Sequence, residues 1–107
     1  MSQRFEGKVV LVTGGASGIG LAVARRVVAE AGRVVLVDLD AEGVERAQGE
    51  LGLQASGLVF DVSDEQGWRD AMASVESRHG RLDALINNAG VLAEGSIEET
   101  DLATWQR

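Results

Sequence analysis

The chain has 107 residues, no cysteine, one histidine and a formal net charge of −7 at pH 7. This length predicts one domain, and the residue counts exclude a disulfide framework, a thiolate metal site and a histidine cluster, so we predict no metal. The negative charge disfavours nucleic acid as a partner. Without an apolar run of about 20 residues or a signal-peptide pattern, we expect no membrane partner and a cytoplasmic location.

The first strand-like run is Val9–Thr13, which is apolar, β-branched and followed by glycine. Such a run predicts a buried strand, and a helical pattern comes after it. We expect one side of this helix to pack inward because its apolar residues recur at helical spacing. The inward residues are expected to be Ile19, Val23 and Val27, with Ala22 beside them. Arg25, Arg26 and Glu30 are expected to face water, and Gly32 is expected to end the helix.

The second unit repeats this order of strand and helix. Arg33–Asp38 predicts another buried strand, and Asp40 has the side chain of a helix N-cap. We expect the following helix to pack through one apolar side, formed by Val44, Ala47 and Leu51.

The third unit begins with a predicted strand from Ala55 to Asp61. Ser63 and Gln66 have the spacing of a capping box, which predicts that a helix begins there. The inward residues of this helix are expected to be Trp68, Ala71, Met72 and Val75. We expect the helix to end at His79–Gly80 and a fourth strand to run from Leu82 to about Asn87.

Strands that are apolar on both faces and alternate with helices are typical of a parallel sheet covered on both sides. Crossover connections of this kind are right-handed. We therefore predict an α/β fold with a doubly wound parallel sheet, and one domain over residues 1–107.

Glycines gather where the first strand meets the first helix, in the sequence Thr-Gly-Gly-Ala-Ser-Gly-Ile-Gly over residues 13–20. Glycines allow a tight turn and a close approach of the backbone to a pyrophosphate, while the helix N-terminus supplies N–H groups to the anion. A flexible connection would also be rich in glycine. The position between strand and helix, together with the acid described next, favours dinucleotide binding.

Asp38 ends the second predicted strand at the expected distance beyond these glycines. A carboxylate there can accept hydrogen bonds from both hydroxyls of an adenosine ribose and would repel a 2′-phosphate. Neither Ala16 and Ser17 in the loop nor Leu39 supplies a cation for such a phosphate. The sequence therefore predicts NAD rather than NADP, although Asp38 as a merely polar end of a strand is the alternative.

Polar residues also follow the third and fourth predicted strands. Asp61 is placed to accept a hydrogen bond from an adenine amine, while Val62 packs on the adenine ring. The alternative for Asp61 is an acid that starts a helix, and this alternative fits the spacing equally well. Asn87-Asn88-Ala89-Gly90 closes the fourth strand at the same edge, where small residues leave room for a ligand.

These motifs, Thr-Gly-x-x-x-Gly-x-Gly, Asp61-Val62 and Asn-Asn-Ala-Gly in this order, resemble the short-chain dehydrogenase/reductase superfamily over the whole chain. The resemblance implies a Rossmann-like sheet in strand order 3-2-1-4 that is the N-terminal part of a longer fold. It implies that the pyrophosphate is surrounded by Gly14, Ser17, Gly18, Ile19 and Gly20. It further implies Asp38 at the ribose, Asp61 and Val62 at the adenine, Asn87 as a brace in the sheet, and Asn88, Ala89 and Gly90 along the cofactor.

The resemblance also shows what is missing for catalysis. Family members use a serine and a Tyr-x-x-x-Lys pair for proton transfer, whereas this sequence has no tyrosine and its only lysine is Lys8. Ser96, Thr100 and His79 could be substitutes, but we expect His79 to be a solvated residue at a helix end. We therefore assign no catalytic residue and predict that the chain binds NAD but is inactive alone.

The sequence patterns also leave two alternative functions to consider and predict how copies of the chain associate. A regulatory or scaffold module that binds NAD without turnover is an alternative of a different class. A methyltransferase that uses S-adenosylmethionine also has a glycine-rich turn and an acid, but the spacing from Gly14 to Gly18 and the run from Asn87 to Gly90 argue against it. Because the fourth strand would have an uncovered apolar edge at Ala84-Leu85-Ile86, we predict a homo-oligomer formed through that edge.

Overall fold

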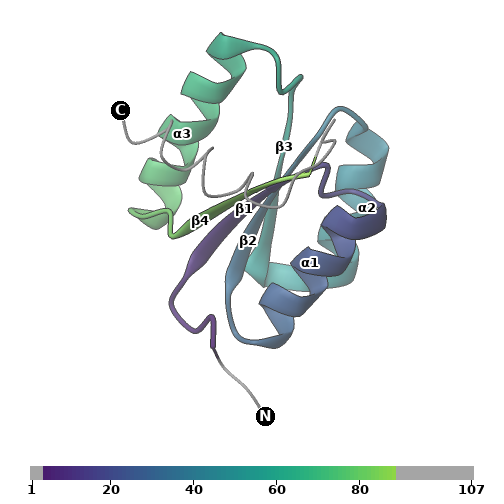
Figure 1. Ribbon diagram of the computed structural model, residues 1–107, viewed down its shortest axis with the longest axis vertical. Helices are drawn as coiled ribbons and strands as arrows, with labels where there is room; N and C mark the ends of the chain where they lie inside the picture. The colour runs from purple at the N-terminus through teal and green to yellow at the C-terminus, as the bar shows by residue number, and fades with distance from the viewer. Residues whose placement is uncertain (1–3, 89–107) are drawn as a thin grey trace.

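The computed structural model describes residues 4–88, in which strands and α-helices alternate (Figure 1). The order of the elements is β1 (Val9–Thr13), α1 (Gly18–Ala29), β2 (Arg33–Asp38), α2 (Ala41–Leu51), the 3-10 turn η1 (Gly52–Gln54), β3 (Ala55–Val59), α3 (Glu65–His79) and β4 (Ala84–Asn87).

The four strands of this region form one parallel sheet in the order β3-β2-β1-β4. Val10 of β1 lies opposite Val34 of β2 on one side and Ala84 of β4 on the other. The predicted doubly wound topology and its 3-2-1-4 order are confirmed. Since β1 and β2 are central, their apolar residues are buried on both faces of the sheet, while β3 at the edge is only half-buried.

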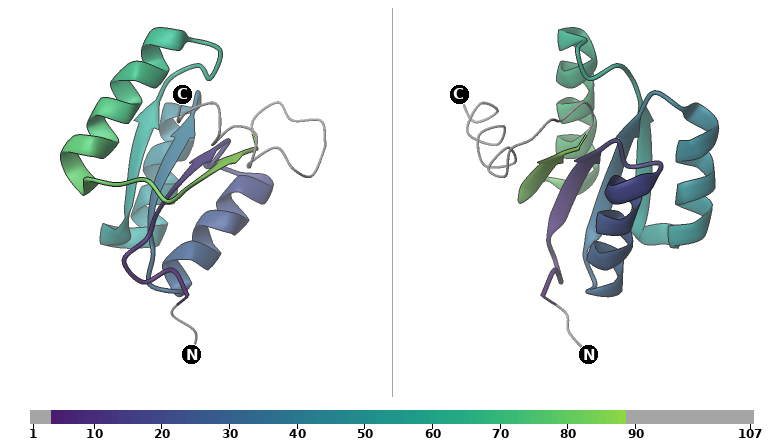
Figure 2. Two further views of the ribbon diagram at one scale, coloured as in Figure 1. Left: turned by 60° about the vertical axis from the view of Figure 1, so that its left-hand side comes forward. Right: turned by 45° about the vertical axis from the view of Figure 1, so that its right-hand side comes forward.

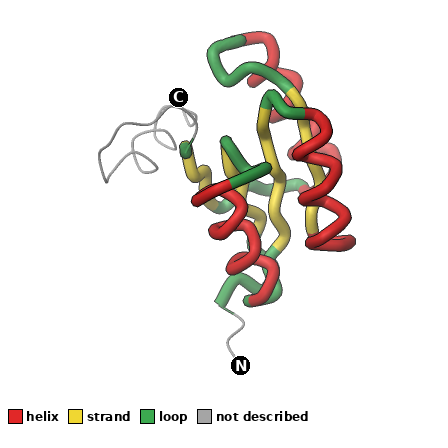
Figure 3. Tube along the Cα trace, turned by 90° about the vertical axis from the view of Figure 1, so that its right-hand side faces the viewer, coloured by secondary structure: helices red, strands yellow, loops and turns green. Residues whose placement is uncertain are grey.

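Helices cover both faces of the sheet (Figure 2). Val10 and Val12 of β1 face the layer of α1 and α2, which lie side by side in front of the strands in Figure 3. Val9 and Leu11 face α3 and pack against Val75. None of the helices in the described region combines the length and the apolar character needed to cross a bilayer.

The inward side of α1 differs from the predicted one. Its buried residues are Gly20, Ala24 and Val27, whereas Ile19 is 72% exposed and Ala22 is also exposed. The physical reason lies in the first turn of the helix, where Gly20 packs directly on the backbone of Gly14. This contact sets the rotation of the helix about its axis and turns Ile19 toward solvent.

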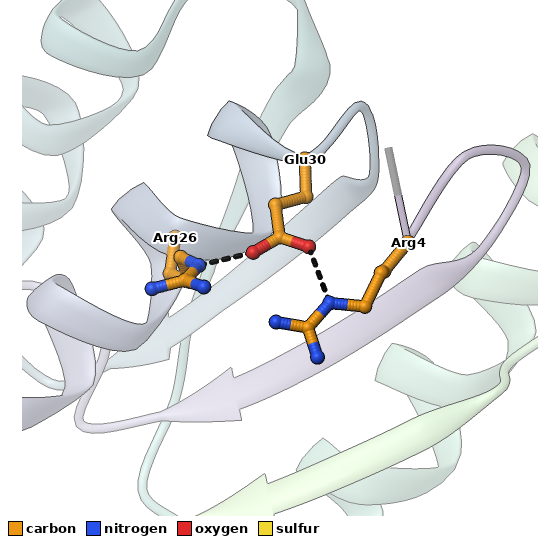
Figure 4. A network of polar contacts seen from close by, with 3 residues as sticks. All are labelled: Arg4, Arg26 and Glu30. Atoms are coloured by element: carbon orange, nitrogen blue, oxygen red, sulfur yellow. Dashed lines mark hydrogen bonds and ion pairs between the residues drawn. The ribbon is translucent and has the colours of Figure 1, made fainter. Parts of the chain in front are cut away.

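Glu30, which we expected to face water, is instead 3% exposed (Figure 4). Its carboxylate binds the guanidinium groups of Arg4, at 3.1 Å from Nε to Oε1, and of Arg26, while its backbone oxygen accepts from the amide of Phe5 at 3.0 Å. The prediction was wrong because the partner Arg4 comes from the segment before β1. Burial of a charged group requires such partners.

Several predicted boundaries shift by one to three residues. Helix α1 ends at Ala29, before Gly32, because the chain turns at Ala31 with a φ of 73°. Strand β3 ends at Val59 rather than Asp61, and β4 begins at Ala84 rather than Leu82. The predicted capping box was also wrong.

The residue that caps α3 is Asp64, whose carboxylate accepts from the amide of Gln66 at 3.1 Å, while the Ser63 hydroxyl donates to Asp61. The predicted N-cap Asp40 is confirmed, and so is the end of α3 at His79–Gly80, where Gly80 adopts the left-handed conformation.

Candidate functional site: a cradle at the carboxyl ends of the strands

The turn between β1 and α1 depends on glycines at two positions. Gly14 has a φ of 64° and Gly18 a φ of 58°, a region that residues with a Cβ rarely adopt. A Cβ on Gly18 would project into open space, so the surface there is free for a ligand. The first amides of a helix have no acceptor within the helix, and α1 begins at Gly18. The turn therefore offers N–H groups to an anion.

Gly20 lies in the first turn of α1 and has no room for a side chain. A Cβ built on it would lie 2.1 Å from the oxygen of Gly14 and 3.1 Å from Nδ2 of Asn88. Gly20 therefore lets the helix pack on the loop and on the end of β4. Its predicted place at the pyrophosphate stays a prediction, and its observed role is close packing.

Asp38 connects the end of β2 to the glycine loop. Its Oδ2 accepts from the amide of Ala16 at 3.1 Å, and its Oδ1 accepts from the amide of Asp40 at 3.2 Å. The carboxylate is half-buried and each of its oxygens has a further lone pair for a hydroxyl group. The structure thus places a fixed negative charge beside the loop.

Thr13 joins the ends of β1 and β4. Its hydroxyl lies 2.9 Å from Oδ1 of Asn87 and accepts from the backbone amide of Asn88 at 2.8 Å. Asn87 is therefore a brace between strands, as the resemblance implied. The sequence analysis missed Thr13 and the amide of Ala16, because both act through partners far away in the chain. The position of Thr13 opposite Asn87 in the sheet is the signal that identifies it.

Asp61 and Val62 follow β3, and their observed contacts are structural. Asp61 Oδ1 accepts from the amide of Ser63 at 2.9 Å and from its hydroxyl at 2.8 Å. These bonds hold the pKa of the exposed Asp61 carboxyl below its usual value. Val62 is half-buried against the core, and its carbonyl accepts from the indole of Trp68 at 2.7 Å. These contacts favour the interpretation of Asp61 as an acid near the start of a helix.

Two apolar side chains near the glycine loop are exposed. Ile19 in the first turn of α1 is 72% exposed, and Leu39 directly after β2 is 66% exposed. Ser17 is also exposed, and its side chain makes no capping hydrogen bond to α1. Such a surface suits the flat apolar rings and the phosphates of a dinucleotide. Ala89 and Gly90, like Ser96 and Thr100, lie outside the described residues.

His79 takes no part in this cradle. It ends α3, next to the amino ends of the strands, and it is half-buried rather than solvated as expected. Burial, and then the charges of Arg33 and Arg78, lower the pKa of its imidazole. Within residues 4–88, no three histidine, cysteine, aspartate or glutamate side chains are grouped so that they could hold a metal ion.

The residues at the carboxyl edge of the sheet define a class of protein. A parallel sheet with a glycine turn after β1, a helix N-terminus beyond it and a carboxylate at the end of β2 is the arrangement of dinucleotide-binding α/β domains. The space beside Gly18 and the close packing at Gly20 fit a pyrophosphate laid along the loop.

Comparison with protein families shows to which family within this class the chain belongs. The family model described as short chain dehydrogenase matches residues 8–107, so the chain belongs to the short-chain dehydrogenase family.

Individual members of the family are similar in sequence and in structure. The chain is 40% identical over 107 residues to the 3-beta-hydroxysteroid dehydrogenase of Comamonas testosteroni, and it covers 42% of that protein. It superimposes with a TM-score of 0.77 and 38% identity on the 3-ketoacyl-(acyl-carrier-protein) reductase of Brucella melitensis complexed with NADH, over 85% of this chain and 41% of that one. It also superimposes on an NAD+-bound xylitol dehydrogenase with a TM-score of 0.76 and 40% identity, over 81% of this chain and 35% of that one. The chain thus spans less than half the length of these relatives.

Proposed function

We propose that this chain binds a nicotinamide dinucleotide, NAD(H) in preference to NADP(H), as the cofactor-binding portion of an alcohol or carbonyl oxidoreductase. The observation that carries the proposal is the hydrogen bond between the Asp38 carboxylate and the amide of Ala16 in the glycine loop, at 3.1 Å. The pyrophosphate is expected at the amides of residues 14–20 and the adenosine ribose at Asp38. When bound, the nicotinamide ring supplies or accepts hydride.

The preference for NAD(H) rests on charge. Asp38 is held by two backbone amides, so it cannot turn away from a ribose without losing both hydrogen bonds. A 2′-phosphate at that ribose would meet a like charge, whereas two hydroxyls would donate to it. The two solved relatives described above with NADH and NAD+ support this preference.

Arg46 is the cation that a competing hypothesis would use. Its Nη2 lies 4.0 Å from Oδ2 of Asp40, and its side chain is 72% exposed. A long exposed arginine could reach a 2′-phosphate, which would favour NADP(H). The matched variants Asp38→Asn and Arg46→Gln separate the two hypotheses.

The proposed chemistry of the chain alone is binding without turnover. The family's general acid is a tyrosine, and none of the 107 residues is a tyrosine. In this proposal the described residues position the cofactor through backbone amides and one carboxylate. The second candidate function is a regulatory or scaffold module that binds NAD without turnover.

The test is a titration of the purified protein with NADH and, in parallel, NADPH, followed by energy transfer from its two tryptophans. We expect saturable binding that prefers NADH. In Asp38→Asn the preference should shrink by about tenfold or more, as the loss of one charge repulsion predicts. Arg46→Gln should leave the preference unchanged, and so should Asp70→Asn, an exposed carboxylate on α3. Tighter binding of NADPH than of NADH would overturn the assignment.

Association of copies is also part of the proposal. Strand β4 pairs with β1 on one side, and within residues 4–88 no strand pairs with its other side. Open backbone groups on a strand edge favour pairing with a second copy. Light scattering over a range of concentrations should show a mass above that of the monomer, and a constant monomer mass would contradict this.

A further inference from the structure

A cavity of about 530 Å³ opens at the end of the sheet opposite to the cofactor cradle. It lies where β1, β2 and β3 begin, beside η1 and the last turn of α3. The residues that matter for its chemistry are Arg33, Ser56, Arg78, His79 and Arg81.

The wall of this cavity is strongly basic although the chain is acidic. Three arginines line it, and none of its lining residues in the described region is an aspartate or glutamate. Arg81 is occupied, because its Nη2 binds Oδ1 of Asp83 at 2.6 Å. The side chains of Arg33 and Arg78 have no hydrogen-bond or ion-pair partner among residues 4–88. Two unpaired guanidinium groups at one cavity attract an anion, and each guanidinium group can bind an oxyanion through two parallel N–H groups.

His79 lies beside the two guanidinium groups on the wall of the cavity. Its Nε2 is buried away from solvent and has no hydrogen-bond partner within residues 4–88, so this atom does not itself face the cavity. The lowered pKa of this imidazole, caused by burial and then by the charges of Arg33 and Arg78, places both guanidinium groups near it. An anion in the cavity would offset both charges and favour the protonated form of the nearby imidazole.

The end of α3 opposes an anion only weakly. A helix C-terminus carries about half a negative charge in its free carbonyl groups. Here the amide of Gly80 already donates to the carbonyls of Glu76 at 3.0 Å and of Val75 at 3.3 Å. Full positive charges on two arginines exceed this partial charge.

We propose that this cavity binds a phosphate monoester, with its phosphoryl group at Arg33 and Arg78 and its organic part in the remaining space. The volume decides between an ester and a free ion, because 530 Å³ is in the range of sites for small organic ligands and exceeds what one phosphate fills. Ser56 supplies a further hydroxyl on the wall. This site is separate from the dinucleotide cradle and lies at the opposite ends of the strands.

The experiment is a titration of the 15N-labelled protein, first with inorganic phosphate and then with glycerol 3-phosphate, at constant ionic strength set with chloride. We expect saturable shifts of the amides of residues 55–57 and 78–81. The amides of residues 14–20 are followed separately, because that loop also offers N–H groups to an anion. The pKa of His79, followed through its ring protons, should rise in the presence of phosphate. The ester should bind at least about threefold more tightly than inorganic phosphate, because it fills more of the cavity.

Variants make the test specific. Arg33→Gln and Arg78→Gln should each weaken the binding of both ligands by about tenfold, as the loss of one charge-assisted hydrogen bond predicts. Arg69→Gln is the matched control, because Arg69 lies on the same helix and pairs with Glu65 outside the cavity. Circular dichroism and the affinity for NADH should be the same in all variants, which separates this site from the proposed cofactor site.

Three outcomes would overturn the proposal. Shifts that grow linearly with concentration, or that are equal in Arg33→Gln, Arg78→Gln and the unaltered protein, would show unspecific attraction only. Shifts at residues 14–20 without shifts at residues 55–57 and 78–81 would place the anion at the cofactor loop only. Equal or weaker binding of glycerol 3-phosphate than of inorganic phosphate would exclude the ester.

Discussion

The amide of Ala16 donates a hydrogen bond to Oδ2 of Asp38 at 3.1 Å, and this bond links two parts of the candidate site that lie 22 residues apart. Under the proposed function Asp38 has two tasks. Its charge would select the ribose, and its oxygen holds the glycine loop against the end of β2. A substitution of Asp38 changes both tasks if it removes the charge and the acceptor oxygen, and only one task if it removes the charge alone.

The pair Asp38→Asn and Asp38→Ala separates these tasks. Asparagine retains an acceptor oxygen for the Ala16 amide but loses the charge, so we expect altered selectivity with a stable loop. Alanine removes the acceptor as well, and the affinity for NADH and for NADPH should both fall by about tenfold. Fluorescence titrations with both cofactors measure this difference. Identical affinities in the two variants would show that the bond to Ala16 has no role in binding.

Gly20→Ala tests the close packing of α1 on the loop. The new Cβ would lie 2.1 Å from the backbone oxygen of Gly14, so the helix or the loop must shift. We expect a loss of about 1–3 kcal/mol in the free energy of unfolding, which is typical of overpacking. Urea denaturation measures it.

Gly49→Ala is the matched control for that variant. Gly49 lies within α2, and a Cβ there would meet no atom within 4 Å. Alanine favours a helix over glycine by about 0.5–1 kcal/mol, so this variant should be more stable than the unaltered protein. Equal destabilisation by the two substitutions would refute the packing argument.

Thr13→Val tests the connection between β1 and β4. Valine has nearly the same shape but cannot accept from the amide of Asn88, which now bonds to the threonine hydroxyl at 2.8 Å. Leaving a buried donor unpaired costs about 1–3 kcal/mol of stability. Thr13→Ser keeps the hydroxyl and should therefore retain most of the stability of the unaltered protein. Hydrogen exchange at Asn88 should accelerate in the valine variant only, and protection there would contradict the assignment.

Glu30→Gln tests the buried carboxylate. The side chain of Glu30 is 5% exposed, whereas its partners Arg4 and Arg26 are 70% and 64% exposed. Water can solvate both arginines after the substitution, so we expect a loss of about 1–3 kcal/mol, less than for a fully buried ion pair. Glu50→Gln removes a partner from the exposed Arg25 and should leave stability unchanged. A smaller effect of Glu30→Gln than of Glu50→Gln in urea denaturation would contradict the argument.

Sequence patterns predicted those features that depend on local periodicity. The apolar runs of β1 and β2 identify central strands, and Asp40 and Gly80 identify helix ends through local chemistry. Two features that were mispredicted or missed depend on distant contacts: the burial of Glu30 on Arg4, and the role of Thr13 on its position opposite β4. Such contacts exist only once the sheet has formed. The rotation of α1 and the cap of α3 depend on local contacts, Gly20 with Gly14 and Asp64 with Gln66, and were mispredicted because the apolar and capping patterns fit more than one register.

The unpaired imidazole of His79 predicts a dependence of stability on pH. Its pKa is lowered from 6.5 in the folded protein by burial and by the charges of Arg33 and Arg78. The unfolded chain therefore binds a proton at a higher pH than the folded one. Stability is full above the unfolded pKa and falls as the pH is lowered through 6.5 toward the folded pKa. Because His79 is the one histidine in the sequence, we expect it to dominate this window.

Urea denaturation of the unaltered protein and of His79→Gln at several values between pH 8 and pH 5.5 checks this sign. The unaltered protein should lose stability as the pH falls, and the variant should lose less, because glutamine takes up no proton in this range. Saturating phosphate should reduce the loss, since an anion beside the imidazolium favours its charged form. A slope that is unchanged in His79→Gln would assign the pH dependence to other groups and would separate His79 from the cavity chemistry.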